Sequence, residues 1–185
     1  MFSRLFVGHP FSSKNYTFPF ILFFAIFSLL QISHLDAGGW GKTKEIIEHE
    51  GVLWNGVYFD MSGVNFTASL PNYSGTVLHN DMATLKGKVD ENSGYVIITS
   101  INQRFAPPTS AQEFVQIVQD ANPDYIVHAI DSKKFGALYA VDMIPLSQDD
   151  VVWRFLSTQD ALIQMGCIDN DISRQLYFFE SIFIH

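Results

Sequence analysis

The stretch Val64-Asn-Phe-Thr-Ala-Ser-Leu70 alternates apolar and polar residues along its whole length. Because successive side chains of a β-strand point to opposite sides, its apolar residues share one face and its polar residues share the other. This period of two predicts a strand with one buried and one solvated face, which is typical of antiparallel sheets.

Further strand patterns lie on both sides of this stretch. Residues 52–58 are apolar and aromatic, and Tyr95-Val-Ile-Ile-Thr-Ser-Ile101 is rich in the β-branched residues that strands favour. Other strands are predicted at 76–79, 84–89, 124–130, 137–144, 151–157 and 161–168. The last four are joined by short connections, which fit antiparallel hairpins and are too short for parallel crossovers.

Two helices are predicted, each with its own N-terminal cap. Ser110-Ala-Gln-Glu113 forms a capping box, in which the serine hydroxyl and the glutamate carboxylate bond exposed backbone donors reciprocally. Asn122-Pro123 ends this helix, and Asp171 can cap a terminal one. The predicted apolar faces comprise Phe114, Ile117, Val118 and Ala121 in the first helix, and Ile172, Leu176, Phe179 and Phe183 in the second.

The order of elements is therefore strands, helix, four-stranded meander and helix. Helices packed on an antiparallel β-sheet define the α+β class. We predict a single α+β domain at 52–185, in which an antiparallel sheet is flanked by helices. A leader at 1–37 and a polar linker at 38–51, with a short helical turn at 44–49, precede this domain.

The leader has the layout of a secretory signal peptide. Arg4 and Lys14 precede an uncharged apolar run from Phe18 to Ile32, and small residues follow from Ala37. We expect these residues to direct export of the chain. The domain would then lie outside the cytoplasm, either in the periplasm or secreted.

A retained signal anchor is the alternative. The apolar run is about 15 residues long, whereas a helix needs roughly 20 to cross a bilayer, which favours a cleaved signal. The cleavage site at Leu35-Asp-Ala37, however, begins with a large residue. A retained anchor would keep Arg4 and Lys14 in the cytoplasm and would contact the inner membrane only through residues 18–32.

Composition excludes nucleic-acid binding and internal disulfide bonding. The leader holds two of the eleven basic residues and one of the nineteen acidic ones, so the remainder carries nine against eighteen, a formal charge of −9. Such a surface repels phosphate backbones. Cys167 is the single cysteine, and its apolar neighbours predict a buried thiol without a nucleophilic role.

No residue pattern predicts a metal, a cofactor or a catalytic centre. The candidate pairs of metal ligands are Glu45 with His49 and His79 with Asp81. Two ligands are fewer than a dedicated metal site uses. Ser62-Gly63 and Ser74-Gly75 hold only half of the Gly-x-Ser-x-Gly elbow of a hydrolase, and His128 is predicted to be a strand residue that faces solvent or bonds a partner.

Five pieces of the sequence occur in a recognisable order. They are Gly63-Val-Asn-Phe-Thr-Ala-Ser-Leu-Pro71, Ser110-Ala-Gln-Glu-Phe-Val115, Gly136-Ala-Leu-Tyr-Ala140, Trp153-Arg-Phe-Leu156 and Ser173-Arg-Gln-Leu-Tyr-Phe-Phe-Glu-Ser-Ile-Phe183. In this order they resemble the PsbP-like superfamily, which includes an extrinsic photosystem II subunit, a Ran-binding import factor and exported bacterial proteins. The resemblance implies an α/β/α sandwich and a binding or assembly role without catalytic residues.

We therefore expect an exported, non-enzymatic binding or assembly domain in the cell envelope, whose partner is an unknown envelope protein or small ligand. Tyrosines that exceed the needs of one core could supply the binding surface; they are Tyr58, Tyr73, Tyr95, Tyr125, Tyr139 and Tyr177. Two alternatives stay open. One is a signal-anchored membrane protein that docks at the bilayer surface, and the other is a small envelope hydrolase in which His79 or His128 meets an acid and a serine.

Overall fold

The computed structural model describes residues 41–61, 63–79, 81–100, 106–147 and 151–185. All of them belong to one compact unit of the chain, His34–His185. Neither α-helix among these residues has the length and apolar character that a bilayer span requires.

The described residues form eleven strands, two α-helices and one 3-10 helix. The strands are β1 (Gly41–His49), β2 (Val52–Met61), β3 (Val64–Pro71), β4 (Thr76–His79), β5 (Met82–Gly87), β6 (Gly94–Ser100), β7 (Tyr125–Ala129), β8 (Tyr139–Pro145), β9 (Val152–Ser157), β10 (Leu162–Ile168) and β11 (Phe183–Ile184). The helices are α2 (Ala111–Ala121), η1 (Ser132–Phe135) and α3 (Ile172–Glu180).

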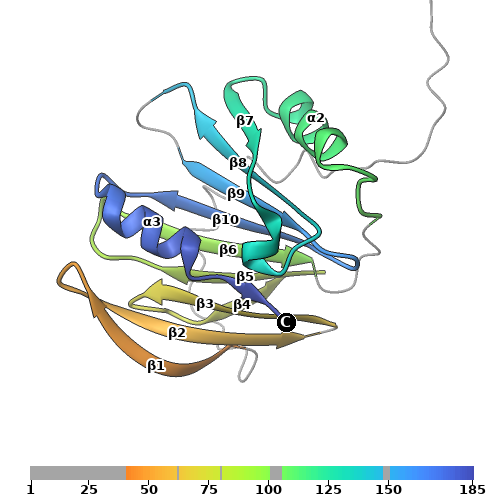
Figure 1. The fold of residues 1–185 in the computed structure, drawn as a ribbon. Helices are drawn as coiled ribbons and strands as arrows, with labels where there is room; N and C mark the ends of the chain where they lie inside the picture. Colours follow the sequence, from red (N-terminus) through yellow and green to blue (C-terminus); the bar gives the residue numbers. More distant parts are fainter. Residues whose placement is uncertain (1–40, 62, 80, 101–105, 148–150) are drawn as a thin grey trace, which may run out of the picture. The chain divides into compact units, whose positions relative to one another are not determined.

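The strands make two antiparallel sheets (Figure 1). The small sheet has the order β1-β2-β3-β11, and the large sheet has the order β4-β5-β6-β10-β9-β8-β7. The predicted α+β class is confirmed at this level, because the fold is rich in antiparallel sheet and carries two α-helices. The sequence pattern predicts one sheet, however, whereas the first three strands and the last one form a sheet of their own.

The chain changes sheets between β3 and β4, in a turn that explains this difference. Asn72 (φ 42°) and Gly75 (φ 112°) adopt positive φ there, a region that glycine, and less readily asparagine, can occupy. Gly87 on β5 lies against the turn, since a Cβ atom at this position would come within 2.3 Å of the Pro71 carbonyl oxygen. The close approach of the sheets therefore requires glycine at this point.

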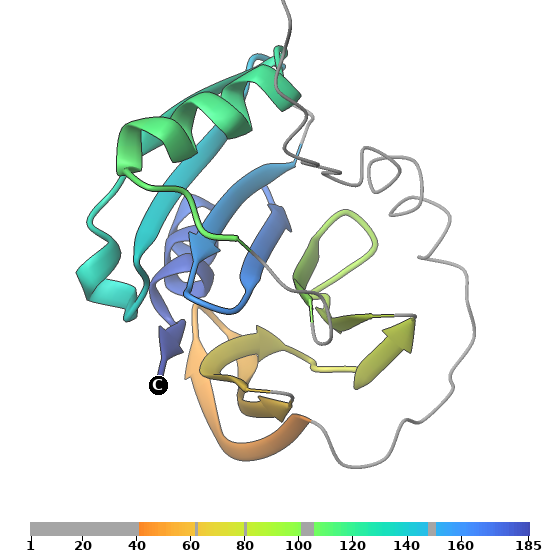
Figure 2. The same ribbon diagram turned by 90° about the vertical axis from the view of Figure 1, so that its right-hand side faces the viewer.

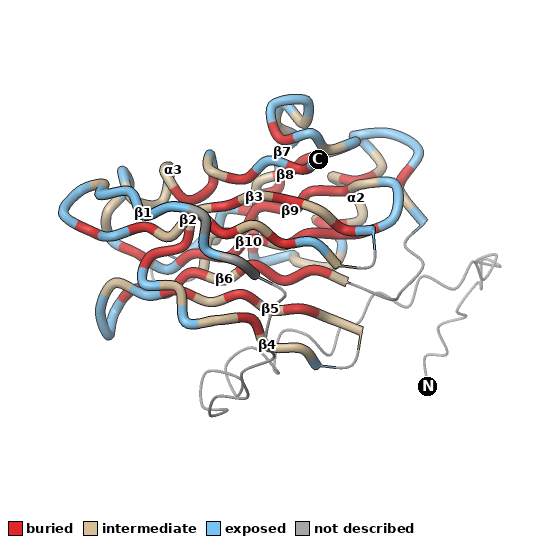
Figure 3. Tube along the Cα trace, turned by 90° about the horizontal axis from the view of Figure 1, so that it is seen from below, coloured by how far each residue is buried: buried red, intermediate tan, exposed pale blue. Residues whose placement is uncertain are grey.

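The two sheets and α3 share one hydrophobic core. The alternation predicted for residues 64–70 is confirmed, because the four apolar side chains are at most 5% exposed. From α3 the core receives Phe178 and Phe179. Figure 3 shows buried positions along the inner strands, and in β9 they are continuous from residue 153 to residue 157.

Helix α2 packs against β7 and β8 and buries Phe114 and Val118. Figure 2 shows it on the side of the large sheet that faces away from α3. The capping box forms in part, since Ser110 Oγ accepts a hydrogen bond from the Glu113 N–H at 3.1 Å. The Glu113 carboxylate accepts instead from the N–H and hydroxyl of Thr109, at 2.6 and 2.5 Å, so the reciprocal bond closes one residue before the cap.

The helical turn predicted at 44–49 is wrong, because these residues belong to strand β1. Pairing with β2 runs from Gly41 to His49, with an irregularity between Thr43 and Glu45. The polar composition that suggested a linker is equally compatible with an edge strand, in which charged side chains stay solvated. The ordered sheet therefore begins before residue 52, inside the predicted linker.

The cap of α3 is confirmed, whereas its predicted apolar side is right at Phe179, which is buried, and wrong at the other three residues. Asp171 accepts a hydrogen bond from the Arg174 N–H at 3.1 Å. Ile172 and Leu176, however, are exposed, and Phe183 lies beyond the helix in β11. The helix buries a different side because it contacts β3 of the small sheet as well as β10 of the large one.

Candidate functional site

Several residues singled out in the sequence cannot be placed. The predicted targeting residues Arg4, Lys14, Phe18, Ile32 and Ala37 lie outside the described residues, as does Ser62. Export and cleavage therefore stay predictions from the sequence.

The histidines considered as metal ligands or bases do not converge. His79 lies on β4 and His128 on β7, which are the two opposite edge strands of the large sheet. His128 is exposed, which is one of the two predicted settings. Within the described ranges, no group of three His, Cys, Asp or Glu side chains could hold a metal ion.

His49 at the end of β1 lies against α3. Its ring stacks on Tyr177 with the centroids 4.2 Å apart, and its Nε2 atom lies 3.4 Å from Ser173 Oγ. Glu50 accepts a hydrogen bond from the same hydroxyl at 3.1 Å. In a hydrolytic triad the acid bonds the histidine rather than the serine, so these contacts do not reproduce the order of a triad. Their effect is to fasten the β1–β2 turn to α3.

The most buried electrostatic cluster surrounds Asp169, whose carboxylate is 1% exposed. Arg174 donates to it twice, from Nη2 at 2.7 Å and from Nε at 2.9 Å. The Tyr95 hydroxyl and the Asp171 N–H, the latter at 2.8 Å, donate to the same carboxylate. Bidentate bonds from arginine to carboxylate are among the strongest in proteins. The cluster therefore fixes the start of α3 to the end of β10.

The titration of this cluster follows from burial and from its bonds. Burial raises the pKa of Asp169, but the hydrogen bonds from Arg174 and Tyr95 lower the pKa by more than burial raises it. The pKa of Asp169 therefore lies below its ordinary value. The pKa of Tyr95 is raised, first by burial and then by its bond to Asp169. Burial also raises the pKa of Cys167, and the prediction that this thiol is buried is confirmed. A thiol that stays protonated is a poor nucleophile.

A second cluster, around Arg154, holds the other end of α3. Its guanidinium, which is 6% exposed, donates to both Asp142 oxygens at 2.7 and 2.9 Å. It donates as well to the Phe179 carbonyl at 2.9 Å and to Glu180 at 3.4 Å, and lies 4.6 Å from the centre of the Phe135 ring. Through these contacts the Arg154 guanidinium joins β8, β9, η1 and α3.

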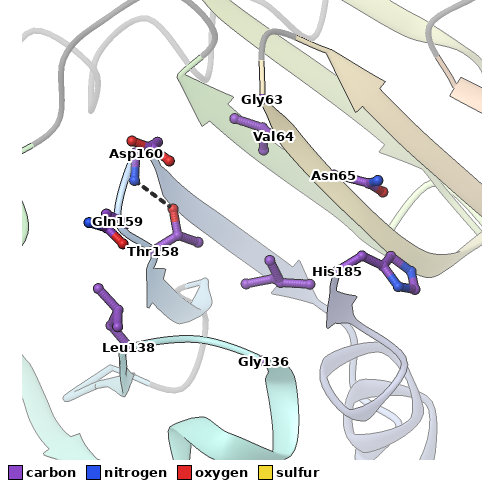
Figure 4. A pocket seen from close by; sticks show the side chains of 10 residues that line it. Gly63, Val64, Asn65, Gly136, Leu138, Thr158, Gln159, Asp160 and His185 are labelled. Atoms are coloured by element: carbon purple, nitrogen blue, oxygen red, sulfur yellow. Dashed lines mark hydrogen bonds between the residues drawn. The ribbon is translucent and has the colours of Figure 1, made fainter.

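A pocket of about 250 Å³ lies between the start of β3, the β9–β10 turn and the C-terminus. Figure 4 shows residues 158–160 on one side of it and Val64 and His185 on the other. The Thr158 hydroxyl accepts hydrogen bonds from the N–H groups of Asp160 and Ala161, at 3.2 and 2.8 Å. The Thr158 hydroxyl is therefore occupied in shaping the turn.

The most exposed apolar surface on the small sheet lies along β1, its edge strand. Ile46 is 62% exposed and Ile47 40%, and Leu53 on the neighbouring β2 is 53% exposed. Figure 3 shows the described part of β1 exposed along most of its length. Sequence reasoning missed this surface, because residues 38–51 were assigned to a linker. The adjacent isoleucines between charged residues were the available signal.

The outer edge of β7, at one side of the large sheet, is closed in a different way. Gln119 of α2 donates from Nε2 to the Tyr125 carbonyl at 2.8 Å and accepts from the Val127 N–H at 3.1 Å. The side-chain amide thus bonds the strand edge as a neighbouring strand would. Among the described contacts of β1, no side chain plays the same role on its outer edge.

In comparisons with known proteins, the chain matches no protein-family model, no curated protein and no solved structure.

Proposed function

We propose that this chain is an exported binding or assembly domain of the cell envelope and that it acts without catalysis. The observation that carries the proposal is the exposed β1 edge, where Ile46 and the neighbouring Leu53 of β2 are exposed on one face of the small sheet and Ile47 is exposed on the other. An edge strand presents a row of backbone N–H and C=O groups that an added strand can bond. Peptide recognition by strand addition uses such an edge for affinity and the flanking side chains for specificity.

The buried ionisable groups support this proposal. Asp169 and Arg154 are the two most buried charged residues described, and each is bonded to groups of the fold itself. Both residues hold α3 in place, so neither is available to act on a substrate. The exposed β1 edge remains for contacts with other molecules, which supports a binding role.

Export is part of the proposal and is supported by the leader alone. A fusion of alkaline phosphatase to the C-terminus is expected to be active, because this reporter folds only outside the cytoplasm. The intact mass of the mature protein separates the two fates of the leader, since a chain that begins near Gly38 is cleaved and a chain that retains residues 18–32 is anchored. An inactive fusion would contradict export.

We further propose that the fold is that of the PsbP-like superfamily. What supports it is the position of α2 and α3 on different sides of the large antiparallel sheet, together with the β7-β8-β9-β10 meander. Experimental coordinates for this chain should then superpose on a member of that superfamily with the same strand order. A different order of strands in the two proteins would contradict the assignment.

The binding role of β1 can be tested in cells with a photo-crosslinking amino acid. Placed at position 46, it should give a discrete adduct on irradiation. Placed at Ile126, which is comparably exposed at 55% but lies on the closed edge strand β7, it should give none. Equal labelling at both positions, or no adduct at position 46, would argue against β1 as a binding edge.

A further inference from the structure

We draw no further inference here: the strongest candidate, the outer face of the small sheet where Tyr58, Thr67 and Phe183 lie side by side across β2, β3 and β11, is a partly exposed sheet face, and nothing in the described part of the structure shows what covers it.

Discussion

The two edge strands β1 and β7 end their sheets in different ways. On β7 the Gln119 amide of α2 bonds the outer backbone at two points, so a helix side chain takes the place of the next strand. On β1 the described contacts leave the outer edge to solvent and expose Ile46 and Ile47. Natural proteins usually cover or interrupt free edges. The open edge of β1 is therefore where the partner strand proposed above would add.

The sheets that carry these edges also differ in how they are held. Strand β7 has a helix across its own sheet face, whereas the small sheet is fastened to the large one through α3 and the two charged clusters at its ends. Substitutions beside α3 should therefore change stability most, and substitutions at the two edges should change it less.

The largest effect is expected from Arg174→Met, which removes the cation from the buried Asp169 carboxylate. Breaking a buried ion pair by removing one partner typically costs about 3–5 kcal/mol, because the remaining charge is uncompensated. Urea unfolding at neutral pH should show a loss of this size. The matched control is Lys134→Met, whose partner Glu180 is 36% exposed; loss of an exposed pair costs about 0–1 kcal/mol. Equal losses in both variants would contradict the role of Asp169.

A smaller effect is expected from Gln119→Ala, which opens the edge of β7. The Val127 N–H and the Tyr125 carbonyl lose a bond that Gln119 provided, and an unsatisfied buried polar group costs about 1–3 kcal/mol. Thermal unfolding should report the loss. Gln116→Ala on the same helix is the control, since the described hydrogen bond of exposed Gln116 goes to Asp120 of the same helix and its loss should be nearly neutral. If both variants melt together, Gln119 does not close the edge.

Acid should weaken the attachment of α3 to β10. Because the pKa of Asp169 lies below its ordinary value of 3.8, the unfolded chain binds this proton first as the pH falls. The stability that Asp169 contributes is therefore complete above about pH 4 and is lost progressively below it. Unfolding free energies measured from pH 2 to 6 should fall less steeply for Asp169→Asn than for the parent chain. Parallel curves would show that this carboxylate does not carry the effect.

The smallest effect on stability is expected from Ile46→Thr on β1. The residue is largely exposed, so its replacement by another β-branched residue should change the unfolding free energy by about 0.5 kcal/mol or less. Capture of a partner by a photo-crosslinking residue at position 48 should nevertheless decrease in this variant. A large loss of stability with unchanged capture would mean that Ile46 serves the core and not an interface.

Local sequence patterns were sufficient to predict most of the strands. The alternation at 64–70 and the capping signals at Ser110 and Asp171 depend on neighbouring residues, and they are confirmed in the structure. The exposed side of α3 was not predictable in this way. Ile172 and Leu176 match a helical stripe, but the helix meets β3 and β10 on another side. A hydrophobic pattern predicts which residues can be buried, while the surroundings of a helix decide which ones are.

The exposed β1 edge, which is the candidate binding site, was likewise not predictable from local sequence patterns. Strand β1 could not be told from a linker, because an edge strand needs no buried alternation of its own and is defined by pairing with β2.

The amino-acid sequence alone determined the antiparallel α+β class and the burial of Cys167, since hydrophobic period and capping act over a few residues. Tertiary structure alone decided that the strands divide into two sheets, that Gln119 closes one edge, and that β1 leaves another open. Those features depend on contacts between segments far apart in the chain, where the geometry of packing, and not local preference, sets the outcome.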